Sequence, residues 1–286
     1  MRIAMKRNAS SLLDRIIALL ERKPIKFIVE PLLRYLYVVY ERYLYNQIKD
    51  KQMPMHVAII PDGNRRWARQ LGLDPKEGHV HGYMKMKEVL QWLYDLGIKI
   101  VTIYAMSYEN CLYRSEDEKE RLFEIIANGF RELMSSGIIE KYGIHVKVFG
   151  KLELAKKTLV EEAKKLEQIS INNRERYLNI ALCYGGRQEI VDAVKAIAEE
   201  VKRGILDPSE ITEETLLKKL STSHLPIPEP DLVIRTSGEL RISNFLLWQI
   251  AYSELYFCDV YWPNFRKIDL YRAIRSYQSR ERRFGR

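Results

Sequence analysis

The sequence predicts an α/β fold, a central and mostly parallel six-stranded sheet flanked by helices, with a helical N-terminal extension. Three observations predict it. Short apolar runs alternate with longer amphipathic segments from residue 55 onward. Gly97, Gly137 and Gly204 stand where the predicted helices should end. No Gly-x-Gly-x-x-Gly follows any of the apolar runs, so the fold is not expected to be a dinucleotide-binding Rossmann fold.

The predicted strands and helices follow one another in a regular order. The apolar runs that predict strands are His56–Ile60, Lys99–Met106, His145–Phe149, Leu178–Tyr184, Asp231–Arg235 and Glu254–Cys258. The amphipathic segments predict helices near 79–96, 116–136, 153–169, 187–203 and 211–220. Ser115 followed by Glu118 has the spacing of a capping box at the start of one of them. We therefore expect a sheet covered on both faces, with ligands bound beyond the carboxyl ends of its strands.

Residues 1–54 are predicted to form a basic helical extension ahead of a domain that spans 55–286. The extension holds 11 basic and 5 acidic residues, a net of +6 out of +9 for the whole chain. Two helices are predicted, at roughly 9–22 and 31–49, and the second carries an apolar stripe. The stripe consists of Leu32, Leu36, Val39 and Tyr43, and it is widened by Leu33, Tyr37, Tyr40 and Leu44 beside them. It fits packing on the domain or on a second subunit, and the basic and aromatic residues beside it fit a membrane surface; both interpretations stay open.

The extension is not predicted to cross a membrane, because its most apolar stretch, Ile25–Tyr40, contains three charged residues and a proline. No signal-peptide pattern is present. The cysteines, Cys111, Cys183 and Cys258, lie far apart in the sequence. An odd, sparse set predicts neither a disulfide framework nor a cysteine-bound zinc ion. We expect a cytoplasmic protein, either soluble or peripheral on the inner face of the membrane.

The first candidate site follows the first predicted strand, in the run Pro61-Asp62-Gly63-Asn64-Arg65-Arg66-Trp67-Ala68-Arg69. The carboxylate of Asp62 is suited to holding Mg²⁺ together with phosphate oxygens of a substrate. Gly63 lets a phosphate approach the backbone, and Asn64 with the start of a helix offers donors. The arginines add planar groups that bind phosphate oxygens in pairs. A plain turn is the alternative for Asp-Gly-Asn taken alone.

A second anion-binding group is predicted after the fifth strand, where Arg235, Arg241 and Ser243 lie close together in the sequence. Glu254, at the head of the last strand, is a second candidate metal carboxylate, and Arg280–Arg286 forms a basic tail. Two anion sites with two separated acids predict two phosphorylated substrates and a divalent ion. The absence of a Gly-x-x-x-x-Gly-Lys-Ser/Thr loop argues against a P-loop nucleotide hydrolase.

Together these motifs resemble the cis-prenyltransferase family, which includes undecaprenyl and dehydrodolichyl diphosphate synthases. The resemblance runs from about His56 to Gly285. Besides the stretch from His56 to Ala68, the matching motifs are Ser107-Tyr108-Glu109-Asn110, Tyr184-Gly185-Gly186-Arg187, Asp231–Thr236, Arg241–Gln249 and Glu254–Phe257. The resemblance implies an Mg²⁺-dependent, homodimeric transferase that condenses isopentenyl diphosphate with farnesyl or geranylgeranyl diphosphate. The implied product is a medium-to-long-chain polyprenyl diphosphate, a lipid carrier for glycan assembly.

The resemblance also implies roles for residues by position. Asp62 and Glu254 would hold the metal ion, and Asp62, Ser107 and Asn110 would line the reacting centre. The residues implied to bind substrate are Gly63, Asn64, Arg65, Arg66, Trp67, His79, Arg114, Arg235, Arg241, Ser243, Arg283 and Gly285. The last two belong to a tail that would reach the isopentenyl site of a neighbouring subunit. His79 is equally well read as a structural histidine, and no residue is assigned as the proton acceptor.

The growing chain is expected to occupy a hydrophobic tunnel. The helix near 116–136 is predicted to line it, through Leu122, Phe123, Ile125 and Ile126. A plain core role for these side chains is the alternative.

Three departures from the family pattern favour an archaeal-type branch. Pro75, with Lys76 beside it, replaces an arginine. Cys111 replaces an aromatic residue, and the arginine that follows falls one residue late, at Arg114. Leu240 replaces a histidine of many bacterial members. Lys76 offers a point charge in place of the missing guanidinium.

Two other classes of function are considered. An inactive partner subunit would have lost the Asp and the arginines of the first motif, but this chain retains Asp62, Arg66, Arg235 and Arg241. A nucleic-acid-binding protein would need a contiguous basic face with exposed aromatics, whereas these arginines gather at strand ends. Nucleic acid is therefore not an expected partner.

Overall fold

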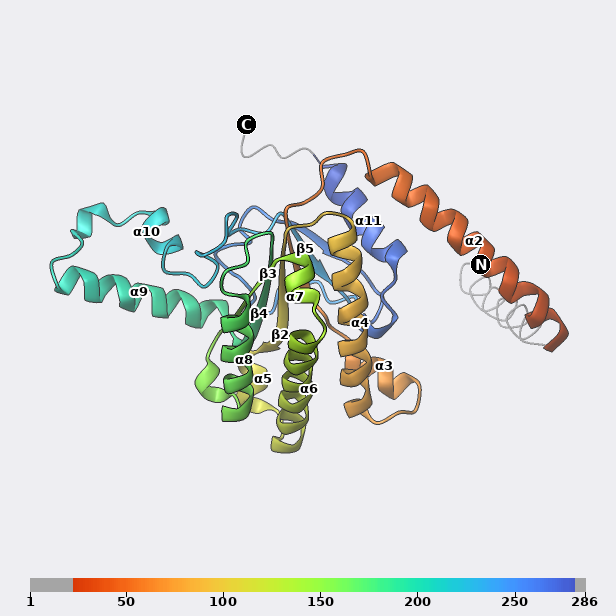
Figure 1. Ribbon diagram of the computed structural model, residues 1–286, viewed down its shortest axis with the longest axis horizontal. Coiled ribbons are helices and arrows are strands. Elements are labelled where there is room, and N and C mark those ends of the chain that lie inside the picture. The colour runs from red at the N-terminus through yellow and green to blue at the C-terminus, as the bar shows by residue number, and fades with distance from the viewer. Residues whose placement is uncertain (1–22, 281–286) are drawn as a thin grey trace, which may run out of the picture.

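The computed structural model describes residues 23–280, and six parallel strands form its central sheet (Figure 1). The strand order is β3-β4-β2-β1-β5-β6. The strands are β1 (His56–Ile60), β2 (Ile100–Ser107), β3 (Ile144–Phe149), β4 (Arg176–Tyr184), β5 (Leu232–Arg235) and β6 (Glu254–Phe257). The predicted fold class is confirmed, and every strand pair of this sheet is parallel.

The helices agree with the prediction where they are long. They are α2 (Lys23–Ile48), α3 (Asn64–Gln70), α4 (Pro75–Asp95), α5 (Tyr108–Tyr113), α6 (Glu116–Ser135), α7 (Ile138–Tyr142), α8 (Lys157–Ser170), α9 (Gly186–Lys202), α10 (Glu213–Leu217) and α11 (Lys267–Gln278). The sequence prediction lacks α5 and α7, which are too short to show a helical period, and it includes only the start of α3 at Asn64. It also lacks α11, although Ile268, Tyr271 and Ile274 recur there at three-residue spacing and are buried.

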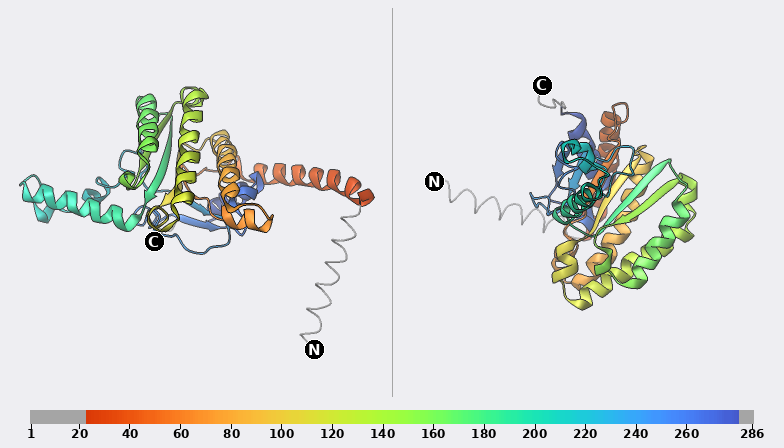
Figure 2. Two further views of the ribbon diagram at one scale, coloured as in Figure 1. Left: turned by 90° about the horizontal axis from the view of Figure 1, so that it is seen from below. Right: turned by 90° about the vertical axis from the view of Figure 1, so that its left-hand side faces the viewer.

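The two faces of the sheet are covered differently. One face packs against α4, α6, α8 and α11, and alternate strand residues such as Ile59 and Ile103 belong to this larger core (Figure 2). The other face, which includes Ala58 and Val233, packs on Phe245 and neighbouring side chains of the irregular segment 242–250. Apolar residues therefore point to both faces of each central strand, as expected for a buried parallel sheet.

Helix α2 is docked on the body only through its C-terminal half. Leu44 and Ile48 are fully buried, and the Arg272 guanidinium lies 5.2 Å from the centre of the Tyr40 ring. The rest of α2 extends away from the body in both figures. The apolar stripe, Leu32, Leu36, Val39 and Tyr43, is exposed. The C-terminal half of the helix therefore packs on the domain, as one interpretation predicted, whereas these four side chains do not. The helix predicted near 9–22 lies outside the described residues.

None of the helices within residues 23–280 combines the length and the apolar composition that a membrane span requires.

Cys111 and Cys183 form a disulfide bond, which the sequence argument did not expect. The two residues are 72 positions apart, but α5 follows β2, and β2 pairs with β4, which ends in Cys183 and Tyr184. Spacing along the chain cannot show that two strands are neighbours in a sheet, so the sequence could not predict that these two cysteines are bonded. Cys258 is free, and burial raises the pKa of its thiol to about 12.

Loss of this disulfide should lower the free energy of unfolding by about 4 kcal/mol, because a loop of this length restricts the unfolded chain strongly. The variant Cys111→Ser/Cys183→Ser and the reduced wild-type protein should show similar losses in guanidinium unfolding. Cys258→Ser is the control and should remain sensitive to reductant. Equal stability of the double variant and the oxidised wild type would contradict the expectation.

Candidate active site

The site lies where the order of the strands reverses. β2 lies on one side of β1 and β5 on the other, so the loops after β1 and β5 diverge and leave a crevice. A cavity of about 540 Å³ opens there. Its charged and polar lining residues are Asp62, Asn64, Arg65, Arg66, Arg69, His79, Ser107, Asn110, Arg114, Arg235, Glu239, Arg241 and Ser243. We call this the cationic cavity, because six of these residues are arginines.

Asp62 lies at the centre of the cationic cavity, directly after β1. The Thr236 hydroxyl holds its backbone by accepting from the amide at 2.9 Å. Its carboxylate accepts from Arg235 at 2.8 Å and from Arg66 at 3.3 Å. Burial pushes the pKa of the Asp62 carboxyl upward, but the two guanidiniums outweigh burial and hold that pKa below its usual value. Asp62 is therefore ionised at neutral pH.

Gly63 is required by the local geometry. Its φ is +102°, and a Cβ atom would lie 2.6 Å from the Tyr261 ring and 2.9 Å from Ser237. It precedes α3, whose first residues, Asn64 to Arg66, line the cationic cavity. Trp67 does not line it; its indole is buried and donates to Asn264 at 2.9 Å. The predicted substrate contact of Trp67 is therefore not formed within this cavity, because the side chain lies on the buried face of α3.

The two predicted anion-binding groups are joined into one. Arg66 donates to Glu239 at 2.9 Å and to Ser237 at 2.7 Å. Glu239 also pairs with Arg241 at 2.6 Å. Arg66 of α3 and Arg241 after β5 thus meet through one carboxylate, which holds the two arginines together.

Arg235 is almost fully buried, with 5% of its side chain exposed. One guanidinium nitrogen donates to Asp62, and another donates to the Ser243 hydroxyl at 2.8 Å and to the Arg241 carbonyl oxygen. Ser243 has a positive φ of 48°, so the segment is held in a conformation that most side chains avoid. Arg235 therefore fixes both the metal-binding candidate and the segment that carries Arg241 and Ser243.

A second cluster lies on the α4–α6 side of the cationic cavity. Arg65, His79 and Arg114 all contact the Glu118 carboxylate, at 3.4, 3.3 and 2.8 Å. Burial, with help from Arg114, lowers the pKa of His79 to about 4, so its imidazole is neutral at neutral pH. The Ser115 hydroxyl accepts from the Glu118 amide, but the Glu118 side chain turns to these cations, so only half of the predicted capping box forms.

Ser107 and Asn110 both line the cationic cavity, at the end of β2 and in α5. The Ser107 hydroxyl caps α5 by accepting from the Asn110 amide at 3.1 Å. Ser107 is therefore the N-cap of α5, a structural role that the sequence motif alone did not indicate.

Other predicted site residues do not meet Asp62. Glu254 begins β6, opposite Leu232, roughly 10 Å along the strands from the edge where Asp62 lies. It pairs with Arg280 at 2.5 Å. The first residues of parallel strands lie at one edge of the sheet and the last residues at the other. The expected pairing of Glu254 with Asp62 around one metal ion is therefore not formed within the chain. Arg283 and Gly285 lie outside the described residues.

The substituted positions are also placed by the structure. Lys76 is exposed in the first turn of α4 and does not line the cationic cavity, so no replacement of the missing arginine is seen there. Arg114, one residue later than in the family pattern, does line it.

Two carboxylates of the cavity wall, Glu118 and Glu239, were missed as site residues. Both neutralise arginines that the sequence motifs identified. Their spacing in the sequence was weak evidence for ion pairs with the arginines, because Glu118 stands four residues after Arg114 and Glu239 two residues before Arg241. A surface ion pair gives the same signal, so sequence spacing alone could not separate the two cases.

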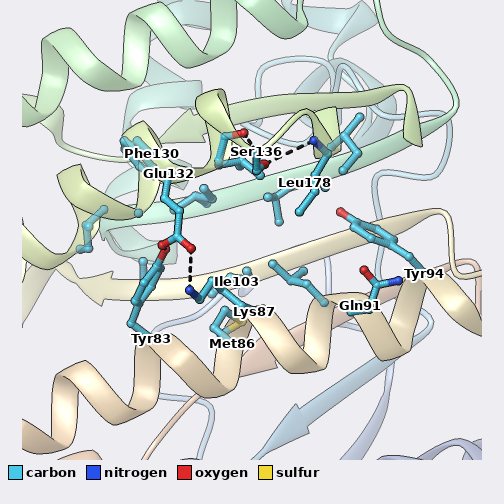
Figure 3. A pocket seen from close by; sticks show the side chains of 18 residues that line it. Tyr83, Met86, Lys87, Gln91, Tyr94, Ile103, Phe130, Glu132, Ser136 and Leu178 are labelled. Atoms are coloured by element: carbon cyan, nitrogen blue, oxygen red, sulfur yellow. Dashed lines mark hydrogen bonds and ion pairs between the residues drawn. The ribbon is translucent and has the colours of Figure 1, made fainter. Parts of the chain in front are cut away.

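A second, apolar cavity of about 200 Å³ adjoins the first, between α4, α6 and the sheet (Figure 3). Ala105 of β2 lines both cavities. On α6, Leu122 lines the cationic cavity, and Ile126, one turn later, lines the apolar one. Phe123 and Ile125, which were predicted to line a tunnel with them, line neither cavity. A ligand with a charged head and an apolar tail fits this arrangement.

The donor set of the cationic cavity fits Mg²⁺ bound jointly with a diphosphate. No cluster of three or more His, Cys, Asp or Glu residues that could hold a metal occurs within residues 23–280. Asp62 supplies an ionised carboxylate beside the arginines, and Mg²⁺ typically takes one or two carboxylates with phosphate oxygens and water. The Nε atoms of Arg114 and Arg235 are buried without a partner among the described residues, so acceptors for them are missing.

Comparisons with known proteins agree with this geometry. A family model described as "Putative undecaprenyl diphosphate synthase" matches residues 60–285. A tritrans,polycis-undecaprenyl-diphosphate synthase (geranylgeranyl-diphosphate specific) from Methanopyrus kandleri is 50% identical over 96% of this chain and 100% of its own. A synthase of the same name from Pyrococcus furiosus is 51% identical over 87% of this chain and 94% of its own. The structure also resembles the crystal structure of lavandulyl diphosphate synthase from Lavandula x intermedia in complex with dimethylallyl diphosphate. The TM-score is 0.79 and the sequence identity 37%, over 82% of this chain and 99% of the other.

Proposed function

This chain belongs to the cis-prenyltransferase family, and from that premise we propose that it elongates geranylgeranyl diphosphate with isopentenyl diphosphate in cis geometry. The observation that carries the proposal is the meeting of the cationic cavity with the apolar cavity at Ala105. Such a junction accepts a diphosphate at one side and a hydrocarbon chain at the other. Geranylgeranyl diphosphate is proposed as the starter because the relatives with about half of their residues identical are named as specific for it.

The proposed reaction breaks the allylic C–O bond and forms a C–C bond. The electron pair of the C–O bond leaves with the diphosphate, the isopentenyl double bond attacks the allylic carbon, and a proton is lost to give the new cis alkene. The developing negative charge is stabilised by the guanidiniums of Arg66 and Arg235. Bound Mg²⁺, held by Asp62, would add positive charge on the leaving diphosphate.

The remaining residues of the cationic cavity would orient the two diphosphates. Asn64 and Arg65 of α3, His79 of α4 and Arg114 after α5 would bind the allylic diphosphate. Arg241 and Ser243 lie after β5 and would bind isopentenyl diphosphate. Fixing both substrates in one cavity supplies rate enhancement through orientation alone. We further propose a homodimer, in which the tail with Arg283 and Gly285 reaches the isopentenyl site of the other subunit.

Product formation tests the proposal directly. The protein would be incubated with Mg²⁺, labelled isopentenyl diphosphate and either geranylgeranyl or farnesyl diphosphate, and the butanol-extracted products would be sized. We expect polyprenyl products, with a higher kcat/KM for geranylgeranyl diphosphate. Equal use of both starters would contradict the starter assignment. No product with either would favour an inactive partner subunit instead.

We propose that the exposed stripe of α2 binds a membrane surface, where the polyprenyl product would partition. Replacing Leu32, Leu36 and Val39 by Ser should lower binding to anionic lipid vesicles by well over tenfold, since burial of even one such side chain contributes about 1.5–3 kcal/mol. Vesicle co-sedimentation would measure it. Val191→Ser/Val194→Ser removes exposed apolar side chains from α9 and is the control. Unchanged vesicle binding, with a shift from dimer to monomer, would show that a second subunit covers the stripe.

A further inference from the structure

Three side chains bridge α4 and α6 across the apolar cavity, and we call them the α4–α6 bridge (Figure 3). The Tyr83 hydroxyl donates to the Glu132 carboxylate at 2.5 Å, and Lys87 donates to the other oxygen of Glu132 at 2.6 Å. The Lys87 ammonium also lies 5.0 Å from the centre of the Tyr83 ring. Each member therefore contacts both of the others, and two come from α4 and one from α6.

Gly129 makes room for the bridge. A Cβ atom at this position would lie 2.8 Å from the Tyr83 ring. Glycine inside a helix is less favourable than alanine by roughly 0.5–1 kcal/mol, so its presence in the middle of α6 has a packing cause. That cause is the Tyr83 ring, which lies against the helix backbone and reaches Glu132 one turn further on.

The bridge lies at the border between hydrocarbon-like surface and water. The walls beneath it are apolar, and they include Met86, Ile126, Phe130 and Leu133. The side chains of Lys87 and Glu132 are 46% and 50% exposed. The bridge therefore covers the solvent side of the apolar cavity, at the place where α4 and α6 would separate if the cavity widened.

The bridge also lies on the path from the cationic cavity. Leu122 lines the cationic cavity, and Gly129 is seven residues further along α6, a rise of about 10 Å. A chain that grows away from the diphosphates past Ala105 reaches the space beneath Tyr83 before it reaches the far wall at Tyr94.

We propose that the α4–α6 bridge of Tyr83, Lys87 and Glu132 limits the length of the prenyl product by holding α4 and α6 together over the growing chain. The inference rests on the proposed function. The charges of Lys87 and Glu132 are half-exposed, so each contact is weak, and loss of one member should be enough to loosen the bridge. While the contacts hold, further isopentenyl units meet a closed wall.

Product sizing with three variants tests the inference. Tyr83→Ala removes the ring, Glu132→Gln removes the charge with little change of shape, and Gly129→Ala displaces the ring while favouring the helix. We expect the fraction of product longer than the most abundant wild-type product to rise about threefold or more in each. The control, Glu88→Gln, removes an equally exposed carboxylate of α4, which pairs with Lys85 and does not line the cavity.

The outcomes separate the inference from the proposed function. Longer products in the three variants, with the wild-type distribution in Glu88→Gln, would support the bridge as a length determinant. An unchanged or shorter distribution, even with a lower Tm, would show a merely structural contact and overturn the inference. A wild-type protein that makes no polyprenyl product at all would instead contradict the proposed function.

Discussion

Replacing Asp62 by Asn should lower turnover by about 10³-fold, because the group removed stabilises charge that develops only in the transition state. Asn keeps the size of the side chain but cannot carry the negative charge that a divalent cation requires. Arg66 and Arg235 hold the pKa of the Asp62 carboxyl below its usual value, so the charge is present throughout the neutral range. Initial rates at saturating concentrations of both substrates, over a series of Mg²⁺ concentrations, measure the effect.

Binding of inorganic pyrophosphate separates this role from a loss of structure. Without Mg²⁺, Asp62→Asn should bind pyrophosphate at least as tightly as the wild type, because a carboxylate that competes for Arg66 and Arg235 is gone. Asp192→Asn, which breaks an ion pair with Lys151 outside the cationic cavity, should change neither turnover nor pyrophosphate binding. Turnover of Asp62→Asn close to that of the wild type would remove Asp62 from the metal site.

The sequence predicted the centre of the site because strand direction determines where strand ends meet. Asp62 follows β1 and Arg235 ends β5, and in a parallel sheet both ends lie at one edge. The alternation of strands with helices was enough to predict this without knowledge of the strand order. The fold class and the meeting of Asp62, Arg66 and Arg235 were therefore predictable.

Contacts that depend on strand order or on strand polarity were not predictable in the same way. Cys111 and Cys183 meet because β2 and β4 are neighbours, which no local pattern encodes. Glu254 was predicted as a second metal carboxylate although it begins its strand, and the parallel arrangement places it at the edge opposite Asp62. In the sequence, Glu132 cannot be distinguished from the other acidic residues of an amphipathic helix. Its contacts with Tyr83 and Lys87 are seen only in the structure.

Replacing Arg235 by Lys should lower kcat/KM for isopentenyl diphosphate by about 10²-fold, or roughly 2.7 kcal/mol of transition-state stabilisation. The Arg235 guanidinium donates in different directions to Asp62, Ser243 and the Arg241 carbonyl oxygen. The lysine side chain is shorter and ends in a single ammonium group, so it cannot make these contacts together. Since only 5% of the side chain is exposed, water cannot replace the lost contacts fully.

The distribution of the loss between the two substrates decides what Arg235 does. If it acts through the segment with Arg241 and Ser243, then KM should rise more for isopentenyl diphosphate than for the allylic substrate. Ser243→Ala removes one of these contacts and should give a smaller shift in the same direction. Arg203→Lys, in an exposed pair with Glu199, is the matched control and should behave as wild type. Equal increases in both KM values would mean that Arg235 acts through Asp62, because a displaced carboxylate weakens the hold on both diphosphates.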